Sequence, residues 1–425
     1  MAQEMKPKMI VQSVVTAIAI LGTGSVAASG FQLLEQNASG LGNAYAGSAA
    51  VAENASTIYY NPAGMTKLKK GGLSLGANLI QPSYKFKNEG SSNAPAATGT
   101  DGGDAGGPAI LPNTYAAAAV TQDLYLGIGI GAPFGLKTEY SPDFAGRFQS
   151  SSFDIETLNV NPSLAYRITD KLSFGVGANW QKMTAEYKRN AAVINSLTQN
   201  TMITLAADSE AWGWNAGALF DVSSTMTMGL SYRSKIKHKL TGTLTSTSQL
   251  VSPDISADAS ITLPDTWVYS IKQQLGDSWE VLGDISRTGW SSINTVPIFR
   301  TSGAAAGSTA QTLDAHFRNT WRVALGGTQK VSDTWKMKYG MAWDQSPVRS
   351  AEERLVSLPD NDRLWFTVGT QLQVDKVSTV DLGAAYIYIR DANIDNNQSS
   401  AGRGRVTGSY TGNVFILGAQ YSLAF

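Results

Sequence analysis

Hydrophobic and polar residues alternate with a period of two through most of the chain after residue 70. The last segment is the clearest, because Phe415, Leu417 and Tyr421 fall on one face while Gly418, Gln420 and Ser422 fall on the other. The same alternation recurs at 172–181, 212–221 and 335–344. This pattern predicts β-strands with one apolar face. Several segments reach the ~9–11 residues that cross a membrane, beyond the ~5–6 residues usual in soluble sheets.

Fourteen segments carry this pattern, and the connections between them alternate between short and long. The short ones include Thr169-Asp170, Ser223-Ser224 and Ser332-Asp333, whose residues favour tight turns. A soluble β-sandwich has no reason to sort its loops in this way, whereas an outer-membrane barrel joins its strands by short periplasmic turns and long outer loops. We therefore predict an all-β fold, a 14-stranded antiparallel transmembrane β-barrel. The expected strands are 71–87, 113–120, 124–132, 152–168, 171–187, 209–222, 225–245, 258–275, 278–291, 317–330, 334–347, 362–373, 378–391 and 407–425.

Six tryptophans lie near the ends of predicted strands. Aromatic side chains gather at both membrane interfaces, so we expect these residues to form two girdles. They are Trp180, Trp212, Trp279, Trp290, Trp335 and Trp343.

The first 28 residues read as a secretory signal peptide. Lys6 and Lys8 precede an apolar run over 9–22, and Val26-Ala27-Ala28 forms a small-residue cleavage site. The alternative, a membrane anchor, would need a longer run of ~20 apolar residues. We expect residues 1–28 to be removed and the mature chain to begin at Ser29.

Residues 29–70 form a different kind of segment. Gly, Asn, Ala and Ser break it too often for a long strand or helix, yet it is too rich in small apolar residues for a disordered tail. A 14-stranded barrel encloses more space than its own side chains fill, because ~8 strands already suffice for a packed interior. We therefore expect 29–70 to be a hatch that plugs a barrel formed by 71–425, which argues against an open diffusion porin.

Composition narrows the range of functions. The chain has 33 basic and 33 acidic residues, so it lacks the basic excess of a nucleic-acid binder. It has no cysteine, two histidines and none of the HExxH, P-loop or GxSxG motifs. We expect no enzyme activity, no cofactor and no metal, although a Ser-His hydrolase remains an alternative.

Several motifs resemble the FadL family of outer-membrane channels for long-chain fatty acids and other hydrophobic molecules. Gly30-Phe31-Gln32-Leu33, the patch at 39–47 and the triplet Asn61, Pro62 and Ala63 resemble the family's N-terminal hatch. The stretch 131–136 and Leu358-Pro359-Asp360 follow in the family's order. The resemblance covers essentially the whole mature chain. It implies a monomer in the bacterial outer membrane whose partners are membrane lipid and a hydrophobic ligand.

The third predicted strand is rich in glycine. Gly127, Gly129 and Gly131 remove side chains from one face, and Pro133 follows them. Glycine weakens or kinks a strand. In the family this strand is kinked and opens sideways into the bilayer, so the resemblance implies a lateral exit here. The alternative is that these glycines only make room for the plug.

The candidate ligand contacts lie at both ends of this path. The family's mature N-terminus reaches into the ligand site, which here implies Phe31. Phe134 and Leu136 begin an apolar stretch that suits an outer groove. We expect the Asn61-Pro62-Ala63 triplet to shape the hatch rather than touch ligand.

A fatty-acid carboxylate would need a cation in the lumen. Strand parity points Arg322, Lys336 and Lys338 inward, with Asp344 as a partner for Lys338. The prediction is thus passive transport of hydrophobic molecules, long-chain fatty acids first. Aromatic hydrocarbons are the alternative ligand, and a surface adhesin or receptor is the alternative function.

Overall fold

The computed structural model describes residues 30–92, 99–192, 200–247 and 254–425, and the expected signal peptide lies outside them. The described residues form nineteen strand segments and five short helical turns. The strands are β1 (Gly71–Asn88), β2 (Ala109–Ala119), β3 (Leu124–Gly131), β4 (Gly135–Glu139), β5 (Ser152–Arg167), β6 (Leu172–Ala192), β7 (Asn200–Asp221), β8 (Met226–Arg233), β9 (Ile236–Ser246), β10 (Ile255–Leu263), β11 (Thr266–Leu275), β12 (Trp279–Thr288), β13 (Thr295–Arg300), β14 (Thr309–Asp314), β15 (Thr320–Lys330), β16 (Trp335–Asp344), β17 (Arg363–Gln373), β18 (Ser378–Asn397) and β19 (Arg405–Ala424). The helical turns are η1 (Leu41–Asn43), α2 (Thr57–Tyr60), η2 (Pro62–Lys67), η3 (Trp290–Ser292) and η4 (Ser399–Ala401).

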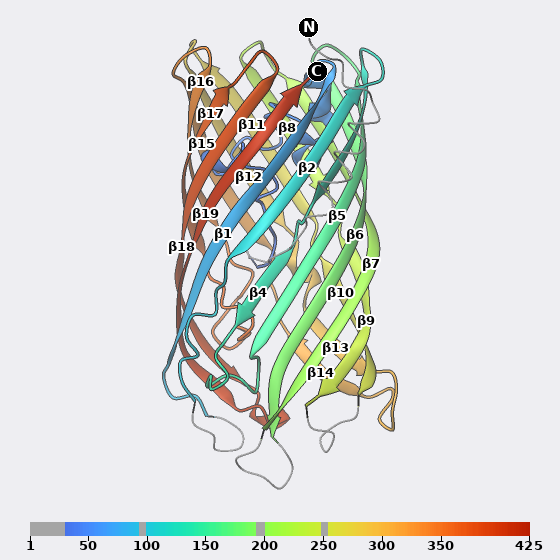
Figure 1. Ribbon diagram of the computed structural model, residues 1–425, viewed down its shortest axis with the longest axis vertical. Helices are drawn as coiled ribbons and strands as arrows, with labels where there is room; N and C mark the ends of the chain where they lie inside the picture. Colours follow the sequence, from blue (N-terminus) through green and yellow to red (C-terminus); the bar gives the residue numbers. More distant parts are fainter. Residues whose placement is uncertain (1–29, 93–98, 193–199, 248–253) are drawn as a thin grey trace.

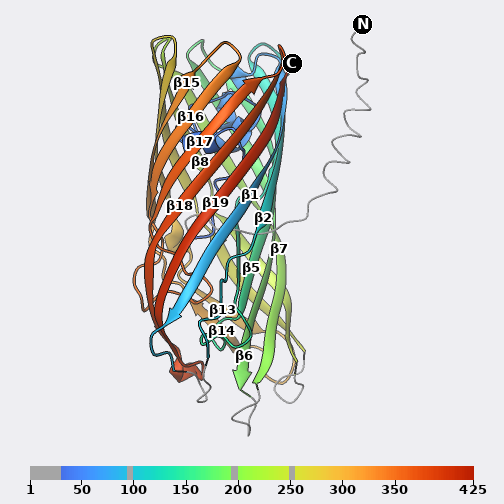
Figure 2. The ribbon, with the colours of Figure 1, turned by 60° about the vertical axis from the view of Figure 1, so that its left-hand side comes forward.

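All strands belong to one closed antiparallel barrel (Figures 1 and 2). The sheet closes because β1 pairs with β2 on one side and with β19 on the other. Five crossings consist of two consecutive segments, namely β3–β4, β8–β9, β10–β11, β12–β13 and β14–β15. The barrel therefore has fourteen strands, as predicted. None of the helices among the described residues is long and apolar enough to cross a membrane.

The strand boundaries differ from the prediction in five places. β6 and β7 run on to Ala192 and back from Asn200, and β18 extends to Asn397. The predicted strand 225–245 breaks at 234–235, and 258–275 breaks at 264–265. The long loop expected at 292–316 contains the hairpin β13–β14. The longer β6, β7 and β18 and the β13–β14 hairpin extend the barrel at the end opposite the short turns.

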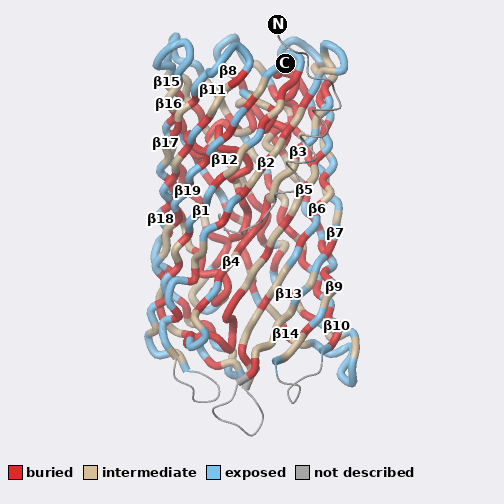
Figure 3. The backbone as a smooth tube through the Cα atoms, viewed as in Figure 1, coloured by how far each residue is buried: buried red, intermediate tan, exposed pale blue. Residues whose placement is uncertain are grey.

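Buried and exposed residues alternate along the strands (Figure 3), and large hydrophobic side chains are exposed on the outside of the barrel, where they form an apolar band. On β7 it extends from Phe220 near the short turns to Trp212, which is 66% exposed. Trp279, Trp335 and Trp343 are also exposed, as girdle residues should be, and Trp180 is half-buried. The girdle prediction is wrong for Trp290, which is 0% exposed. The turn η3 follows Gly289 and breaks the strand parity, so this ring points into the lumen.

Residues 30–70 lie inside the barrel near the end that carries the C-terminus and the short turns (Figure 1). Most of them are buried, and their polar groups bond to the inner wall. Glycines on the wall make room for this segment. A Cβ at Gly340 would come within 2.2 Å of the Asn43 carbonyl carbon, and one at Gly229 within 2.0 Å of the Ala49 oxygen. The segment thus occupies the position expected of a hatch.

Candidate ligand pocket and strand break

An apolar pocket lies in the lumen on the outer side of the N-terminal segment. Its empty volume, which includes space open to solvent, is about 760 Å³. Eighteen of its twenty lining side chains carry no polar atom, the exceptions being Tyr187 and Ser357. The pocket is lined by Phe31, Leu136, Phe153, Ile155, Met183, Ala185, Tyr187, Leu205, Leu240, Ala259, Ile261, Ile293, Val296, Ile298, Leu313, Ala315, Phe317, Leu355, Ser357 and Leu358. Such a lining suits a hydrocarbon.

Phe31 forms part of the pocket wall at the base of an aromatic cluster. Its ring centroid lies 5.0 Å from that of Trp290 and 5.9 Å from that of Phe134, both edge-to-face. Trp290 in turn packs 6.0 Å from Phe317. A ligand that fills this pocket therefore touches the first described residues of the chain.

The same segment bonds to the interruption between β3 and β4. The Leu33 amide donates to the Pro133 carbonyl at 2.8 Å, and the Gly135 amide donates to the Phe31 carbonyl at 2.9 Å. These two bonds make an antiparallel bridge between Gln32 and Phe134. The N-terminal segment thus acts as a short strand that pairs, from inside the lumen, with the broken third strand.

Side chains stabilise the break as well. Gln36 Nε2 donates to the Ala132 carbonyl at 2.8 Å, and the Phe134 amide donates to Thr157 Oγ1 at 3.0 Å. Thr157 Oγ1 also donates to the Phe134 carbonyl at 2.6 Å. The polar backbone groups exposed by the break are therefore satisfied by residues of the hatch and of β5.

The break interrupts the wall of the barrel. β3 pairs with β2 only as far as Thr114 opposite Ile130, and β4 pairs with β5 alone among the described residues (Figure 1). Residues 109–113 of β2 therefore have no strand partner on that side. Further out, the loop between β1 and β2 covers the wall beside β4. The Glu139 amide at the end of β4 donates to the Ala105 carbonyl of this loop at 3.1 Å.

The glycines of β3 face the hatch. A Cβ at Gly127 would lie 2.5 Å from Met65 Sδ, and a Cβ at Gly131 would lie 2.4 Å from Gln36 Oε1. Gly129 faces Tyr115 and Ile58 in the same way. The glycines therefore leave room for Met65, Gln36 and Ile58 of the N-terminal segment and for Tyr115 of β2, and the interruption itself comes after Gly131.

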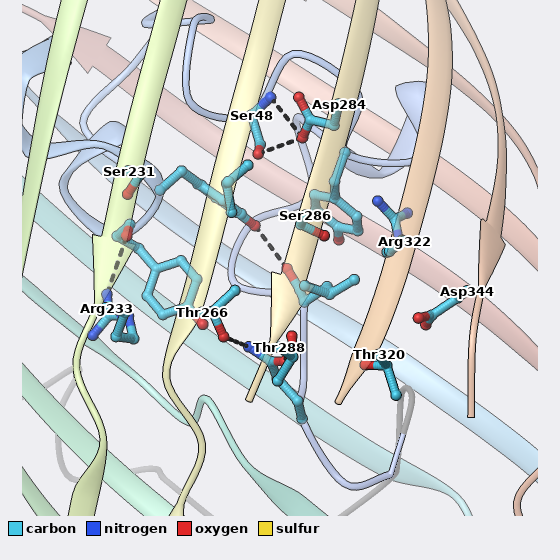
Figure 4. A pocket seen from close by; sticks show the side chains of 16 residues that line it. Ser48, Ser231, Arg233, Thr266, Asp284, Ser286, Thr288, Thr320, Arg322 and Asp344 are labelled. Carbon is cyan, nitrogen blue, oxygen red and sulfur yellow. Dashed lines mark hydrogen bonds between the residues drawn. The ribbon is translucent and has the colours of Figure 1, made fainter. Parts of the chain in front are cut away.

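A second cavity lies on the other side of the N-terminal segment, and it is polar (Figure 4). Its empty volume is about 770 Å³, and Arg233, Asp284, Arg322 and Asp344 line it together with serines and threonines. Gln32 lines this cavity while Phe31 lines the apolar pocket. The N-terminal segment therefore separates an apolar chamber from a polar one.

The hatch body, the part of 30–70 that follows the N-terminal segment, is bound by charged groups of the barrel wall. Lys338 Nζ lies 2.9 Å from Glu53 Oε2 and 3.2 Å from Asp381 Oδ1, and it donates to the Ser39 carbonyl at 2.9 Å. Burial alone would raise the pKa of Glu53, but the charge of Lys338 lowers it to about 2. The predicted pairing of Lys338 with Asp344 is wrong, because Asp344 lies opposite Arg322 in the register.

On the opposite wall, uncharged donors of the hatch body bond to one carboxylate and one backbone carbonyl of the barrel. Asp284 accepts from the Gly47 amide at 2.7 Å, and Asn61 Nδ2 donates to the Ala218 carbonyl at 2.9 Å. Asn61 also caps η2 by accepting from the Ala63 amide at 3.1 Å, with Pro62 in the first position of the turn. None of the Asn61-Pro62-Ala63 triplet lines the apolar pocket.

Cations lie at the outer rim of the apolar pocket. Arg189 is two residues beyond the lining residue Tyr187 on β6, and Arg300 is two residues beyond Ile298 on β13. Arg189 Nε donates to Gln311 Oε1 at 2.7 Å. Burial lowers the pKa of the Arg189 guanidinium to about 10, and the nearby positive charges of Arg403 and Arg300 act in the same direction. An anionic head group at this rim would lie above an apolar chamber.

The predicted site residues thus divide between three places. Phe31 and Leu136 line the apolar pocket, with Phe134 packed on Phe31 and Pro133 in the break. Arg322 lines the polar cavity, where it donates to the Ala44 carbonyl at 2.7 Å. Lys338 anchors the hatch, and neither it nor the half-buried Lys336 reaches the apolar pocket.

Sequence reasoning missed three residues of this region. They are Trp290, which packs behind the pocket on Phe31 and Phe317, Thr157 at the break, and Asp360. The Asp360 carboxylate accepts from the Gly30 amide at 3.0 Å and pairs with buried Arg363. For Asp360 the sequence did carry a signal, because the triplet Leu358-Pro359-Asp360 is one of the motifs that resemble the family.

Comparisons with known proteins agree with this architecture. Residues 19–425 match the family described as outer membrane protein transport protein (OMPP1/FadL/TodX). The chain is 29% identical to the long-chain fatty acid transport protein of Salmonella typhi, over 96% of this chain and 97% of the relative. It is 31% identical to outer membrane protein P1 of Haemophilus influenzae, over 88% and 89%.

Solved structures show the same fold. A FadL homologue from Pseudomonas aeruginosa superposes with a TM-score of 0.85 at 24% identity, over 93% of this chain and all of that one. The Ralstonia pickettii toluene transporter TbuX gives a TM-score of 0.68 at 17% identity, over 92% and 100%. The chain belongs to the OMPP1/FadL/TodX family of outer-membrane transport proteins.

Proposed function

We propose that this chain carries long-chain fatty acids passively across the outer membrane and releases them sideways through the β3–β4 break. The observation that carries the proposal is the position of residues 31–33. One side of this short segment forms the wall of an apolar pocket, and its backbone bonds to the break. A ligand that displaces Phe31 therefore also strains the bridge between Gln32 and Phe134.

The rim of the pocket favours an amphiphile over a plain hydrocarbon. Arg189 and Arg300 lie two residues beyond lining residues of the apolar chamber. Hydrogen bonds between a guanidinium and a carboxylate are charge-assisted and stronger than neutral ones. A fatty acid would place its carboxylate at this rim and its chain in the pocket.

The hatch body is held more firmly than the N-terminal segment at residues 31–33. The buried cluster around Lys338 and the Asp284 contacts join it to β12, β16 and β18. By contrast, the bonds between the N-terminal segment and the break are neutral. Because a buried ion pair is costly to open, exit past the hatch body is less favourable than exit through the wall.

Aromatic hydrocarbons are the second candidate ligand. The near absence of polar atoms in the pocket lining favours them. The toluene transporter TbuX shares this fold. The two candidate ligands differ in their need for Arg189 and Arg300, because a fatty acid has a carboxylate for these side chains to bind and an aromatic hydrocarbon has none.

Uptake assays separate the possibilities. Cells without their own transporter would express the chain and receive radiolabelled oleate or toluene. We expect saturable oleate uptake that is lost in Ala259→Trp, which fills the pocket, and retained in Ser260→Trp, which faces outward on the same strand. Uptake of toluene without uptake of oleate would assign aromatic hydrocarbons as the ligand in place of fatty acids. Uptake of neither would favour the adhesin or receptor alternative.

A further inference from the structure

Three lysines form a column on the outer wall of β9. Lys235 precedes the strand, and Lys237 and Lys239 follow at every second position, all exposed. They alternate with Ile236, His238 and Leu240, which are buried in the lumen. The ammonium groups therefore project away from the barrel, toward the surrounding membrane and its surface.

The column begins beside the last tryptophans of the apolar band. Ser234, just before it, exchanges two hydrogen bonds of 2.9 Å with Trp214 of β7. A Cβ at Gly213 would lie 2.6 Å from Ile236, so the two strands remain adjacent. From Phe220 to Trp212 the band spans roughly 27 Å along β7, or about 20 Å along the membrane normal at the usual tilt. The lysines thus lie at the level of the head groups.

This level belongs to the outer leaflet. The short turns and the C-terminus are at the other end of the barrel (Figure 1). In outer-membrane barrels the short turns face the periplasm. The head groups beside the lysines are therefore those of the outer leaflet of the outer membrane.

Aromatic rings form a platform directly below the column. Tyr232 lies 5.0 Å from Trp214 and 4.4 Å from Trp267, measured between ring centroids. Both tryptophans are exposed, by 52% and 45%. Arg287 stands opposite Trp267 in the register of β11 and β12 and adds a fourth cation at the edge of the platform. Amphipathic rings of this kind anchor at the boundary between acyl chains and head groups.

Two of the lysines are not neutralised by the protein. Lys235 lies 3.7 Å from Asp265, whereas Lys237 and Lys239 make no ion pair within the described part of the chain. On the neighbouring strands the exposed Glu210 accepts from Trp180 Nε1 at 3.3 Å, and Asp208 and Asp258 stand opposite Thr241. Lys237 and Lys239, which lie further out than Lys235, are therefore available to an external anion.

We infer that Lys235, Lys237 and Lys239 form a binding site for the phosphate groups of the phosphorylated glycolipid in the outer leaflet, whose acyl chains pack on the platform of Trp214, Tyr232 and Trp267. Lysine is a good phosphate ligand because it acts as a compact point charge. Basic residues beside a membrane strengthen binding to anionic head groups in proportion to their number. The site lies away from the transport path and would hold one lipid against the wall at β7–β12.

Native mass spectrometry of the full barrel with bisphosphorylated lipid A tests this site. The triple variant K235Q/K237Q/K239Q should bind at least tenfold more weakly than the parent chain. The matched control K70Q/K171Q/K376Q removes three exposed lysines at the short-turn end and should bind as the parent does. Lipid A without phosphates should bind the parent as weakly as bisphosphorylated lipid A binds the triple variant.

Two results would overturn the inference. One is equal lipid A binding by the parent and the triple variant. The other is equal binding of phosphatidylglycerol and lipid A, which would show general attraction of anions. Heat-modifiable gel mobility of each variant establishes that the barrel is folded before the comparison is made.

Discussion

Phe31 should control how firmly the N-terminal segment is docked. Its side chain is 4% exposed and packs against Trp290 and Phe134. Replacing a buried Phe by Ala costs roughly 3–5 kcal/mol. We take the lower end, about 3 kcal/mol, because one side of the ring already faces a cavity. The two backbone bonds of the Gln32–Phe134 bridge can still form in Phe31→Ala. The lost free energy is therefore that of packing the N-terminal segment against the barrel wall.

Amide hydrogen exchange measures this loss directly. A change of about 3 kcal/mol corresponds to roughly 150-fold in the population of the undocked segment. The amides of Leu33 and Gly135, which donate across the bridge, should therefore exchange about 150-fold faster in Phe31→Ala. Phe144→Ala is the control, because that ring is also buried but stacks on Tyr140 in the outer loops. Unchanged protection of Leu33 and Gly135 would refute the assignment of Phe31 to docking.

Three further predictions concern the hatch, its pH response and the rim. Lys338→Met leaves the buried Asp381 carboxylate without its cation, which costs roughly 3–5 kcal/mol, and it also removes the partner of Glu53. It should admit vancomycin into cells, whereas Lys330→Met, which breaks an exposed pair with Asp333, should not. Burial raises the pKa of Glu35 from 4.5 to about 7. Because the folded-state pKa is the higher one, resistance to unfolding should fall as pH rises from about 4.5 to about 7, and Glu35→Gln should remove this slope in urea titrations. Arg189→Gln should weaken oleate binding by about tenfold or more and leave toluene binding unchanged in calorimetry, and equal effects on both ligands would contradict a carboxylate at the rim.

The period-two alternation, together with the alternating short and long connections, was enough to predict the number of strands. It works because lipid on one side and a lumen on the other impose the pattern on every crossing. The hairpin β13–β14 was within reach of the same method, since Val296 and Ile298 are buried while Phe299 is exposed. The Gly and Ser residues around it, such as Ser302, Gly303, Gly307 and Ser308, are typical of a loop and mask this signal.

Other features depend on contacts that one strand does not reveal. Trp290 reads as a girdle residue until the turn η3 reverses its direction. Lys338 finds its partners on the hatch and on β18, so Glu53 and Asp381 follow from register rather than from nearness in sequence. Thr157 carries no signal of its own, because a threonine in a strand looks the same whether or not its hydroxyl bonds to a neighbouring break.

A disulfide between residues 32 and 134 tests the central claim most directly. These residues face each other in an antiparallel bridge, a pair whose spacing suits a disulfide, and the chain has no other cysteine. The account predicts that oxidised Gln32→Cys/Phe134→Cys loses oleate uptake, that a reductant restores it, and that each single variant transports throughout. Undiminished uptake by the oxidised double variant would show that the N-terminal segment need not leave the strand break for transport to occur.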